Sequence, residues 1–593
     1  MTSSPDHPAR PRATLLRVLG GLRPDRARMC VVLALAVLTT AMTVIVPALL
    51  GRATDLIVEG VSGDGIDVGA LRTVLATAGL LAAAAWVCQV AQGRLIAVTV
   101  QRMASHLREQ ADSKLSRLPL RYFDTRPRGE VLSRATNDID NLTQTVQQVF
   151  ARALASLLLV VGTMTMMLRI SLLLTTVLLV TVPATLWAAR TVARQARPQF
   201  SRQWAATGAL SGHIEEMYTG HELVTAFDRR AQAARTFAEH NDALRAAGIK
   251  AQLISGLIAP TLTLLSNITY VLVAVIGALR VASGALSVGD IQAFFQYVLQ
   301  FGQTTGTIAS LTGQVQSAAA SAERVFELLD AEEEEPDTVD APSVGSVRGR
   351  VAFEEVSFRY QADEPLIEDL SLTVEPGRTV AIVGPTGSGK TTLVNLLMRF
   401  YEPDSGRITL DGTDITRLPR GELRGTIGMV LQDTWLFGGT IADNIAYGRP
   451  DAPREQVEAA ARAARADGFI RTLPEGYDRR LDEEGGGLSA GERQLLTIAR
   501  AFLTEPSLLI LDEATSAVDT RTELLVQQAT TALRRGRTSF VIAHRLSTIR
   551  DADEILVMEA GRIVEHGSHE ALLAEGGAYA RLYAAQFASS PAA

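Results

Sequence analysis

The first half of the chain is dominated by long apolar runs that carry no charge. Met29–Leu50 contains no charged residue and is long enough to cross a hydrocarbon core of about 30 Å. This run is too long for the apolar region of a signal peptide, so we expect it to be retained as a membrane span. Similar runs cover about Thr73–Gln92, Leu253–Leu279 and Ile291–Thr312.

The stretch between Leu154 and Ala189 has a single charge, Arg169. It holds two spans if the chain turns at Arg169–Ser171, although hydrophobic periodicity alone does not prove this division. The total is then six spans. An even number is required if both ends of the chain lie in the cytoplasm, which favours six spans over five.

The charges between the spans predict how the membrane half is oriented. The loop at 51–70 has four acidic residues and one arginine, whereas the segment at 94–152 is rich in arginine. Because positive loops stay on the cytoplasmic side, we expect the first loop outside and the second inside. Residues 1–28 hold six arginines and are predicted to be a cytoplasmic amphipathic segment on the membrane surface. The chain is therefore expected in an inner or plasma membrane, with both termini cytoplasmic.

The pattern changes after residue 330. Residues 331–346 form an acidic linker that contains proline, and short β-type runs then alternate with helical patterns, as in an α/β domain. We therefore predict a helical membrane domain at 29–330, with long intracellular helical extensions at about 94–150 and 190–250. An α/β domain is predicted at 347–593.

A phosphate-binding loop follows the apolar run Thr379–Val383. Gly384–Thr391 matches G-x-x-x-x-G-K-[ST] and leads into a helical pattern, which is the strand–loop–helix context that the motif requires. Glycines let backbone N–H groups converge on an anion, and the helix N-terminus adds partial positive charge. We expect Lys390 to reach the β- and γ-phosphates of ATP and the Thr391 hydroxyl to hold Mg²⁺. The predicted loop residues are Gly384, Pro385, Thr386, Gly387, Ser388, Gly389, Lys390, Thr391 and Thr392.

Two carboxylates end the strand-like run that begins at Leu508. They are Asp512 and Glu513, and downstream of a phosphate-binding loop the first is expected to support Mg²⁺ and the second to face the attacking water. The domain at 347–593 is therefore predicted to be a P-loop ATPase that uses ATP and Mg²⁺.

The run Leu488–Gln494, Leu-Ser-Ala-Gly-Glu-Arg-Gln, precedes a helical pattern and resembles the ABC signature Leu-Ser-Gly-Gly-Gln. Phosphate loop, signature, the two carboxylates and His544 occur in the family's order. The chain therefore resembles an ABC half-transporter, with an exporter-type six-helix membrane domain fused to a C-terminal ABC ATPase domain. The resemblance covers nearly the whole chain, and it makes a soluble P-loop kinase or GTPase untenable.

The resemblance implies roles for residues that carry little information alone. Tyr360 would stack on adenine, Gln432 would contact Mg²⁺ and signal to the membrane domain, and His544 would sense the γ-phosphate. Glu513 would be the general base. The metal ligands implied are Thr391, Gln432 and Asp512.

The resemblance also implies a dimer of two such halves. Ser489, Gly491 and Glu492 would close over ATP held by the other half, and Asp519 would lie in the D-loop at the dimer interface. Breaks in the intracellular helices at 122–129 and 220–227 match the family's coupling helices. Ala490 and Glu492 depart from the signature, and a carboxylate near phosphates is electrostatically unfavourable. We therefore predict a heterodimer, with a homodimer as the alternative.

The last predicted span carries a stripe of uncharged polar residues. Gln292, Gln296, Gln300, Gln303, Thr307, Ser310 and Gln314 fall within an arc of about 80° on one helix face. Amides in a bilayer need partners, so this face is predicted to line a translocation path, with a hydrogen-bonding seam between helices as the alternative. The path residues predicted are Gln292, Gln296, Gln300 and Gln303.

Charge and cysteine content bear on which partners and sites are expected. The net charge of −7 gives no case for a nucleic-acid partner, and Cys30 and Cys88 lie in apolar runs, so neither a disulfide framework nor a zinc site is expected. Only three lysines occur in the chain, and one of them, Lys390, lies in the phosphate-binding loop, which supports a chemical role for it there. The leading function is ATP-driven export of an amphipathic or lipid-like compound across the bilayer. An importer on the same scaffold and an ATP-gated channel or sensor remain as alternatives.

Overall fold

The computed structural model describes residues 14, 17, 18, 20, 21, 25–62, 65–337, 344–361, 363–432, 434–481, 487–512, 520–543 and 545–586. The chain divides into two units, one formed by Met1–Ser116 with Arg128–Ala331 and the other by Arg117–Pro127 with Glu332–Ala593. The short segment Arg117–Pro127, which the sequence leaves inside the membrane half, therefore belongs with the second unit.

The described elements of the first unit are all helical. They are α2 (Arg26–Ser62), α3 (Val68–Leu115), α5 (Arg128–Ala135), α6 (Asn137–Gln148), the π-helical turn η2 (Val149–Ala153), α7 (Leu154–Ile170), α8 (Leu172–Thr219), α9 (His221–Ala226), α10 (Arg230–Gly256), α11 (Ile258–Ala282) and α12 (Val288–Leu329). At 1.5 Å per residue, a helix of 48 residues such as α3 or α8 is about 72 Å long, well beyond the thickness of a bilayer.

Within the described residues, five helical segments are long and apolar enough to cross a membrane. They contain α2, α3, α7, α8 and α11. The sixth predicted span lies in α12, which is 42 residues long and has no charge from 291 to 322. Helix α12 is not among these five segments, so α12 as a span remains a prediction.

The break between the third and fourth spans lies where the sequence predicts it. Helix α7 ends at Ile170, and Ser171 has an extended backbone. The hydroxyl of Ser171 accepts the backbone N–H of Leu174 at 3.4 Å and so caps α8. A serine at this position satisfies one of the free N–H groups of a helix start, which explains why the chain turns here.

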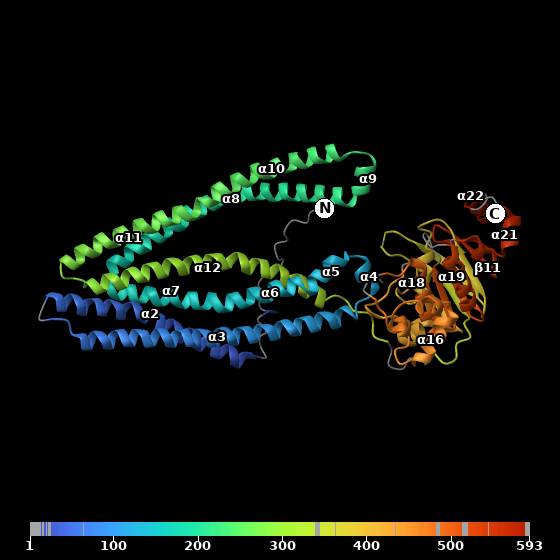
Figure 1. The fold of residues 1–593 in the computed structure, drawn as a ribbon, viewed down its shortest axis with the longest axis horizontal. Helices are drawn as coiled ribbons and strands as arrows, with labels where there is room; N and C mark the ends of the chain where they lie inside the picture. The colour runs from blue at the N-terminus through green and yellow to red at the C-terminus, as the bar shows by residue number, and fades with distance from the viewer. Residues whose placement is uncertain are drawn as a thin grey trace. The chain divides into compact units, whose positions relative to one another are not determined.

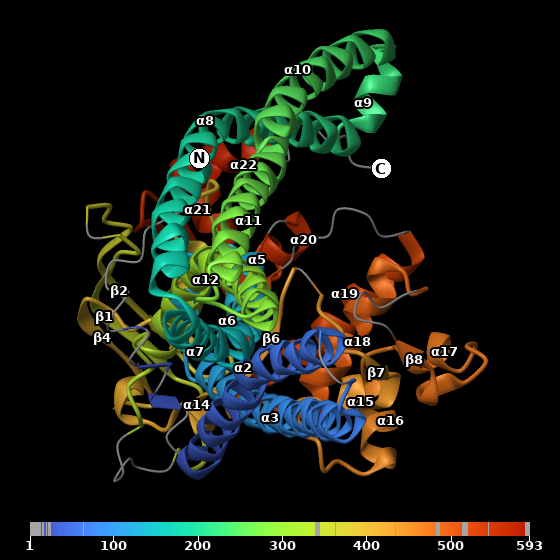
Figure 2. The same cartoon turned by 90° about the vertical axis from the view of Figure 1, so that its left-hand side faces the viewer.

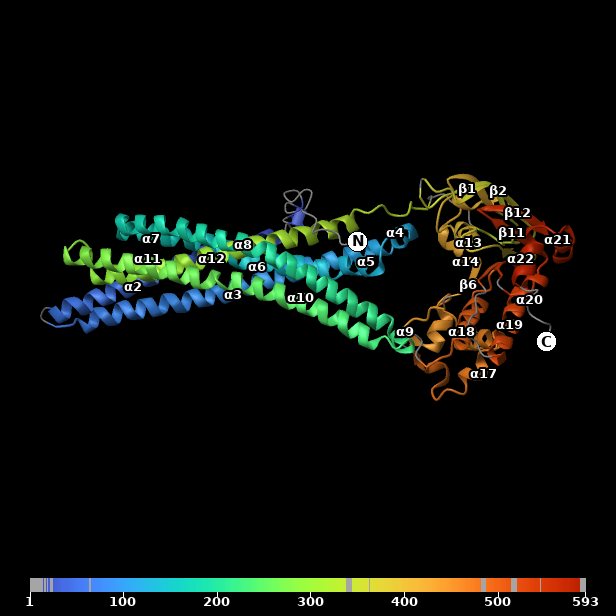
Figure 3. The ribbon, with the colours of Figure 1, turned by 90° about the horizontal axis from the view of Figure 1, so that it is seen from above.

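Helices α8 and α10 lie side by side, and α9 joins their far ends (Figures 1 and 2). Figure 3 shows α9 again at the tip of this hairpin. Three large apolar side chains near the tip, Tyr218, Leu223 and Phe227, are 84%, 65% and 73% exposed. The described part of the chain therefore does not cover this apolar tip.

One apolar core of the first unit is built from side chains of α2, α7, α8, α11 and α12. Phe294 and Tyr297 of α12 are fully buried there, and the Tyr297 hydroxyl donates to the carbonyl of Val44 in α2 at 2.6 Å. Gly51 and Gly289 let α2 and α12 approach closely, because a Cβ on Gly289 would lie 2.0 Å from the Gly51 carbonyl oxygen. One face of α12 is thereby fixed against its neighbours.

The second unit is an α/β domain. Its strands are β1 (Val351–Phe358), β2 (Ile367–Val374), β3 (Thr379–Val383), β4 (Ser405–Leu410), β5 (Thr413–Asp414), β6 (Ile427–Val430), β7 (Gly439–Thr440), β8 (Arg480–Leu481), β9 (Leu508–Asp512), β10 (Thr538–Ile542), β11 (Glu554–Glu559) and β12 (Arg562–Gly567). Its helices are α4 (Leu120–Asp124), α13 (Lys390–Leu397), η3 (Ile415–Arg417), α14 (Arg420–Gly425), α15 (Ile441–Ala446), α16 (Arg454–Ala463), α17 (Asp467–Ile470), η4 (Gly476–Asp478), α18 (Ala490–Leu503), α19 (Thr520–Arg534), α20 (Leu546–Arg550), α21 (His569–Glu575) and α22 (Ala578–Gln586).

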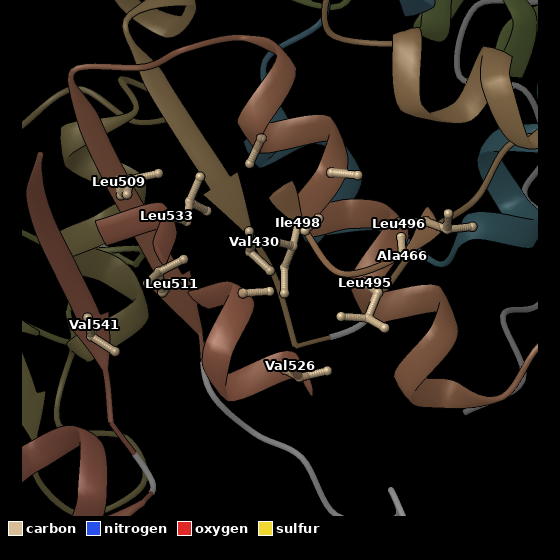
Figure 4. Close-up of a cluster of buried hydrophobic side chains, with 14 of the residues drawn as sticks. Val430, Ala466, Leu495, Leu496, Ile498, Leu509, Leu511, Val526, Leu533 and Val541 are labelled. Carbon is tan, nitrogen blue, oxygen red and sulfur yellow. The ribbon is translucent and has the colours of Figure 1, made fainter. Parts of the chain in front are cut away.

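Two main sheets organise the second unit. The larger has the order β12-β11-β3-β10-β9-β6, in which β12 is antiparallel and the other strands are parallel. The smaller sheet, β2-β1-β4-β5, is antiparallel. Every residue of β3 and β10 is buried, as expected for parallel strands covered on both faces. Figure 4 shows the buried apolar core on one face of the larger sheet, where Ile498 of α18 lies next to Val430 of β6.

The beginning of the acidic linker is held against the second unit by arginines. Asp337 accepts a bond from Arg420 at 3.0 Å, and Glu334 lies 3.7 Å from Arg424. Glu333 pairs with Arg117 at 2.8 Å. The acidic residues therefore tie this stretch to basic side chains, so its described part does not behave as a free tether.

Candidate nucleotide site and membrane path

The phosphate loop leaves β3 and enters α13 through three glycines with left-handed backbone. Gly384, Gly387 and Gly389 have φ of 153°, 82° and 95°. A side chain at Gly384 is also excluded sterically, because a Cβ there would lie 2.1 Å from the carbonyl oxygen of Met558. Only glycine meets both demands without strain, and the resulting turn directs N–H groups toward one point.

Lys390 is the first residue of α13 and bends back over the loop. Its ammonium donates to the carbonyl of Gly384 at 2.9 Å and to that of Pro385 at 2.8 Å. Burial lowers the pKa of Lys390, while the nearby charge of Asp512 opposes this shift. The cation is thus placed at the mouth of the loop, where it is available to an anion.

Ser388 provides a test of whether the loop fits a phosphate ligand. It is 2% exposed, and its buried hydroxyl oxygen has no hydrogen-bond partner among the described residues. A buried polar atom without a partner indicates a missing ligand or water. Together with the glycine turn and Lys390, this hydroxyl fits the polyphosphate of ATP.

Tyr360 lies just beyond β1 and beside the start of α13. Its hydroxyl donates to the Thr392 hydroxyl at 3.2 Å and accepts from the Asn395 amide at 3.4 Å. The ring meets those of Phe358 and Tyr401 edge-on, with centroids 4.9 and 5.0 Å away. Tyr360 is therefore held rigidly next to the phosphate loop. Stacking on adenine stays a prediction.

The helix α4 contacts this tyrosine cluster inside the second unit. The Tyr401 hydroxyl donates to the carboxylate of Asp124, and Arg121 donates to the carbonyl of Tyr360 at 3.0 Å. Burial and the Asp124 carboxylate raise the pKa of Tyr401, so its hydroxyl stays protonated. Nothing in the sequence singles out Tyr401. An aromatic four residues after the first helix of a P-loop domain gives no signal by itself.

Asp512 ends β9, and its charge acts on Lys390. Its role in holding Mg²⁺ stays a prediction. Gln432 follows β6 and is exposed. Thr391 and Thr392 follow Lys390 in α13, the first exposed and the second buried. Glu513, Asp519 and His544 lie outside the described residues, so their roles remain predictions from sequence.

The signature forms the start of α18 through a reciprocal cap. The Glu492 carboxylate accepts the backbone N–H of Ser489 at 2.7 Å, and the Ser489 hydroxyl accepts the N–H of Glu492 at 3.3 Å. Gly491 is buried between them. The carboxylate is stabilised by a helix N-terminus, so the departure from glutamine at Glu492 keeps a capping function.

The polar stripe of α12 lies along the edge of its buried face. Gln303 and Ser310 are exposed, whereas Gln296, Gln300 and Gln314 are partly buried. Gln292 accepts a hydrogen bond from the Thr54 hydroxyl of α2. The N-terminal end of the stripe therefore makes the bond expected of an interhelical seam, while Gln303 stays exposed. Thr54 was not singled out from the sequence.

Family models match both halves of the chain. Residues 29–305 match the model of the ABC transporter transmembrane region, and residues 367–516 match the ABC transporter model.

Related proteins match almost the whole length. The chain is 49% identical over 599 residues to a fatty acid ABC transporter ATP-binding/permease protein of Mycobacterium tuberculosis, covering 95% of each chain. It is 40% identical over 504 residues to an ATP-dependent lipid A-core flippase of Chromobacterium violaceum, covering 83% of this chain and 84% of the relative. A solved bacterial Atm1-family ABC exporter with ATP bound is 31% identical, with a TM-score of 0.74 over 96% of this chain and 99% of that one.

Proposed function

Because the chain belongs to the ABC transporter family and joins a membrane domain to an ATPase domain, we propose that it exports an amphipathic or lipid-like compound. The ATPase domain binds and hydrolyses ATP, and hydrolysis is coupled to transport. Several apolar helices make it a multi-pass membrane protein. Export rather than import, the lipid-like substrate and the cytoplasmic ATPase domain are the proposed parts.

The amphipathic character of α12 is the observation that favours a lipid-like substrate. One face of this helix is buried through Phe294 and Tyr297, and an adjoining edge presents amides that are partly open. A compound with an apolar body and a polar head fits such a boundary, because each part meets a surface of its own kind. Two relatives are named for a fatty acid and for a lipid, which supports the same class.

Mg²⁺ is proposed as the metal that accompanies ATP. Thr391, Gln432 and Asp512 would hold it, since hydroxyl, amide and carboxylate oxygens are the ligands that this hard cation prefers. Bound Mg²⁺ supplies charge neutralisation at the phosphates. Of the chain's own groups, Lys390 binds phosphate, Glu513 orients the attacking water and accepts its proton, and His544 contacts the γ-phosphate.

ABC half-transporters work as dimers, and the partner of this chain is either identical or different. The heterodimer proposal is supported by the altered signature at Ala490, where the family has glycine. Glu492 departs from the signature too, but it keeps a capping role. The exposed tip formed by Tyr218, Leu223 and Phe227 lies at one of the two expected coupling helices, and its apolar surface suits a contact with an ATPase domain of the dimer. If the protein purified alone is a stable dimer with full transport activity, the heterodimer proposal is wrong.

The proposed function is tested in sealed vesicles that contain the purified protein with its ATPase domain outside. We expect ATP-dependent accumulation of a fluorescent lipid-like compound inside the vesicles, against its gradient, and stimulation of ATP hydrolysis by that compound. The Glu513→Gln variant serves as the control without hydrolysis. ATP-driven movement in the opposite direction would indicate an importer. Passive equilibration triggered by ATP would indicate a channel.

A further inference from the structure

One charged side chain is held half-buried near the end of the signature helix α18. Arg500 lies about three helical turns after Ser489, roughly 16 Å further along the axis. It is the only charged residue in the C-terminal half of α18, residues 497–503. Burial lowers the pKa of Arg500, and its hydrogen-bond partner in the described part of the chain is an uncharged residue, Asn444. A buried cation without a carboxylate partner is costly, so stability alone does not explain why arginine stands here.

The guanidinium of Arg500 reaches out of α18 to Asn444 in α15. Its Nε donates to the Asn444 carbonyl at 2.9 Å, and its Nη2 donates to the Asn444 Oδ1 at 3.2 Å. Asn444 is 2% exposed, and its side chain accepts the N–H of Phe437 at 2.9 Å and donates to the carbonyls of Phe437 at 2.8 Å and Thr440 at 3.1 Å. The side-chain amide therefore uses all its donors and acceptors. Through it, Arg500 is tied to the loop that follows Gln432.

Two aromatic rings cover the same guanidinium. The rings of Phe437 and Tyr447 stack with centroids 4.2 Å apart, and the Arg500 Cζ lies 5.9 and 5.2 Å from these centroids. A cation over an aromatic face is attracted by the quadrupole of the ring. The backbone is also close here, because a Cβ on Gly448 would lie 2.5 Å from the Thr504 methyl group. The chain on this side therefore fits tightly around the end of α18.

The same stretch, residues 437–448, also holds the strand that precedes the signature. Its short strand β7 pairs with β8, and the N–H of Ile441 donates to the carbonyl of Arg479 at 3.0 Å. The signature is thus held by this stretch from both sides, through β8 before Ser489 and through Arg500 after it. Because α18 is a continuous helix, a change of its direction at Arg500 moves Ser489 as well.

We propose that Arg500 is a positioning residue for ATP hydrolysis, which fixes the direction of α18 through Asn444 and thereby places Ser489 against the γ-phosphate of the ATP that the signature closes over. The planar guanidinium reaches two oxygens of one residue at once, and the compact ammonium of a lysine lacks this fork. The role is independent of the substrate and of the direction of transport, since it concerns the hydrolysis step alone.

The test measures ATP hydrolysis and fluorescent-ATP binding by the full-length protein. Arg500→Gln should lower kcat about tenfold, because misplacing a reacting group by a distant substitution costs up to about a hundredfold. The phosphate loop of the same chain is untouched, so its ATP affinity should stay within about twofold of the wild-type value. Arg500→Lys should give a kcat between the two, since it keeps the charge over the rings and loses only the fork. A wild-type kcat in Arg500→Gln would overturn the proposal.

A double substitution separates positioning from stability. Ser489→Ala alone should lower kcat about a hundredfold, since it removes a donor to the phosphate charge. If Arg500 acts through Ser489, adding Arg500→Gln should cost nothing further, and the double variant should also be about a hundredfold slower than the wild type. Independent effects would multiply to about a thousandfold. Multiplication, or a wild-type rate in Ser489→Ala, would overturn the proposal.

Arg537 provides the matched control. Burial lowers its pKa too, its Nη1 donates to the Leu533 carbonyl at 2.5 Å, and its Cζ lies 6.0 Å from the centroid of the Phe502 ring of α18. These contacts reach α18 and α19 but not residues 437–448.

Arg537→Gln should lower the melting temperature as Arg500→Gln does, but its effect on kcat should multiply with that of Ser489→Ala. If Arg537→Gln also adds nothing to Ser489→Ala, the comparison reports stability, and the positioning role of Arg500 is wrong. If Arg500→Gln fails to fold, Arg500→Lys carries the same comparison with Ser489→Ala, and multiplied effects there overturn the proposal.

Discussion

Glu492 and Ser489 cap each other at the start of α18, with a distance of 2.7 Å from the Ser489 nitrogen to the Glu492 carboxylate. The serine of the signature is thereby fixed in position by a residue three places along the chain. A glutamine at position 492 would preserve the bond, since its amide oxygen accepts the same N–H.

The cap predicts a difference between two substitutions of Glu492. Glu492→Ala should destabilise the ATPase domain by about 1 kcal/mol and lower ATP hydrolysis, because Ser489 loses its support. Glu492→Gln should behave like the wild type in both respects. Thermal unfolding and steady-state ATPase assays measure the two effects, with Glu455→Ala in α16 as a control for loss of a helix-start glutamate. Equal damage by Gln and Ala would show that the charge, not the cap, matters.

Glu513 is predicted to be the general base of ATP hydrolysis. Glu513→Gln should reduce the hydrolysis rate by about 10²–10⁴-fold, since the amide cannot accept the proton of the attacking water. ATP should still bind, because the substitution leaves the phosphate loop intact. Phosphate release and fluorescent-ATP titration measure these two properties. Hydrolysis at the wild-type rate would remove Glu513 from the mechanism.

Lys390 is predicted to act in nucleotide binding itself. Lys390→Ala should weaken ATP affinity about ten- to a hundredfold, because hydrogen bonds to a charged group contribute roughly 1.5–3 kcal/mol. Fluorescent-ATP titration measures the loss. Lys250→Ala is the control for loss of a lysine away from the loop, because Lys250 is exposed in α10. Unchanged affinity in Lys390→Ala would contradict the placement of its ammonium at the loop mouth.

The bond between Tyr401 and Asp124 predicts a coupling defect. Tyr401→Phe keeps the ring contact with Tyr360 but loses the bond to α4, so ATP affinity should hold while stimulation of hydrolysis by substrate falls. The control is Tyr477→Phe, which removes a similar bond, from Tyr477 to Asp467 at 2.7 Å, without touching α4. Each variant should lose about 0.5–1.5 kcal/mol of stability. A coupling defect of the same size in both would point to stability alone.

The exposure of α12 side chains to water can be measured with single cysteines, introduced into a variant in which Cys30 and Cys88 have been replaced. Gln296→Cys, Gln300→Cys and Gln303→Cys should react with water-soluble thiol reagents, and their rates should change when ATP is trapped by Glu513→Gln. Phe294→Cys and Phe301→Cys should react slowly, because the native side chains are 0% and 7% exposed. Fast labelling at 294 and 301 with protection at 296, 300 and 303 would refute this face as the path.

The sequence by itself determined the parts whose signal is local. Apolar runs identify spans because each must cover the bilayer thickness alone, and Ser171 marks a helix start through its own hydroxyl. The phosphate loop is equally local, since Gly384, Gly387 and Gly389 and Lys390 lie within seven residues. Even the buried and polar faces of α12 follow from the spacing of its residues.

The tertiary structure decided the relationships between residues far apart in the chain. Tyr401 and Asp124 are separated by 277 positions, and Thr54 and Gln292 by 238. No local pattern encodes either bond, because each exists only after two segments have packed. The same holds for the grouping of α4 with the ATPase unit and for the unpartnered oxygens of Thr39 and Gln300. A side chain's type is a property of the sequence, but whether it finds a partner depends on which surfaces burial brings together.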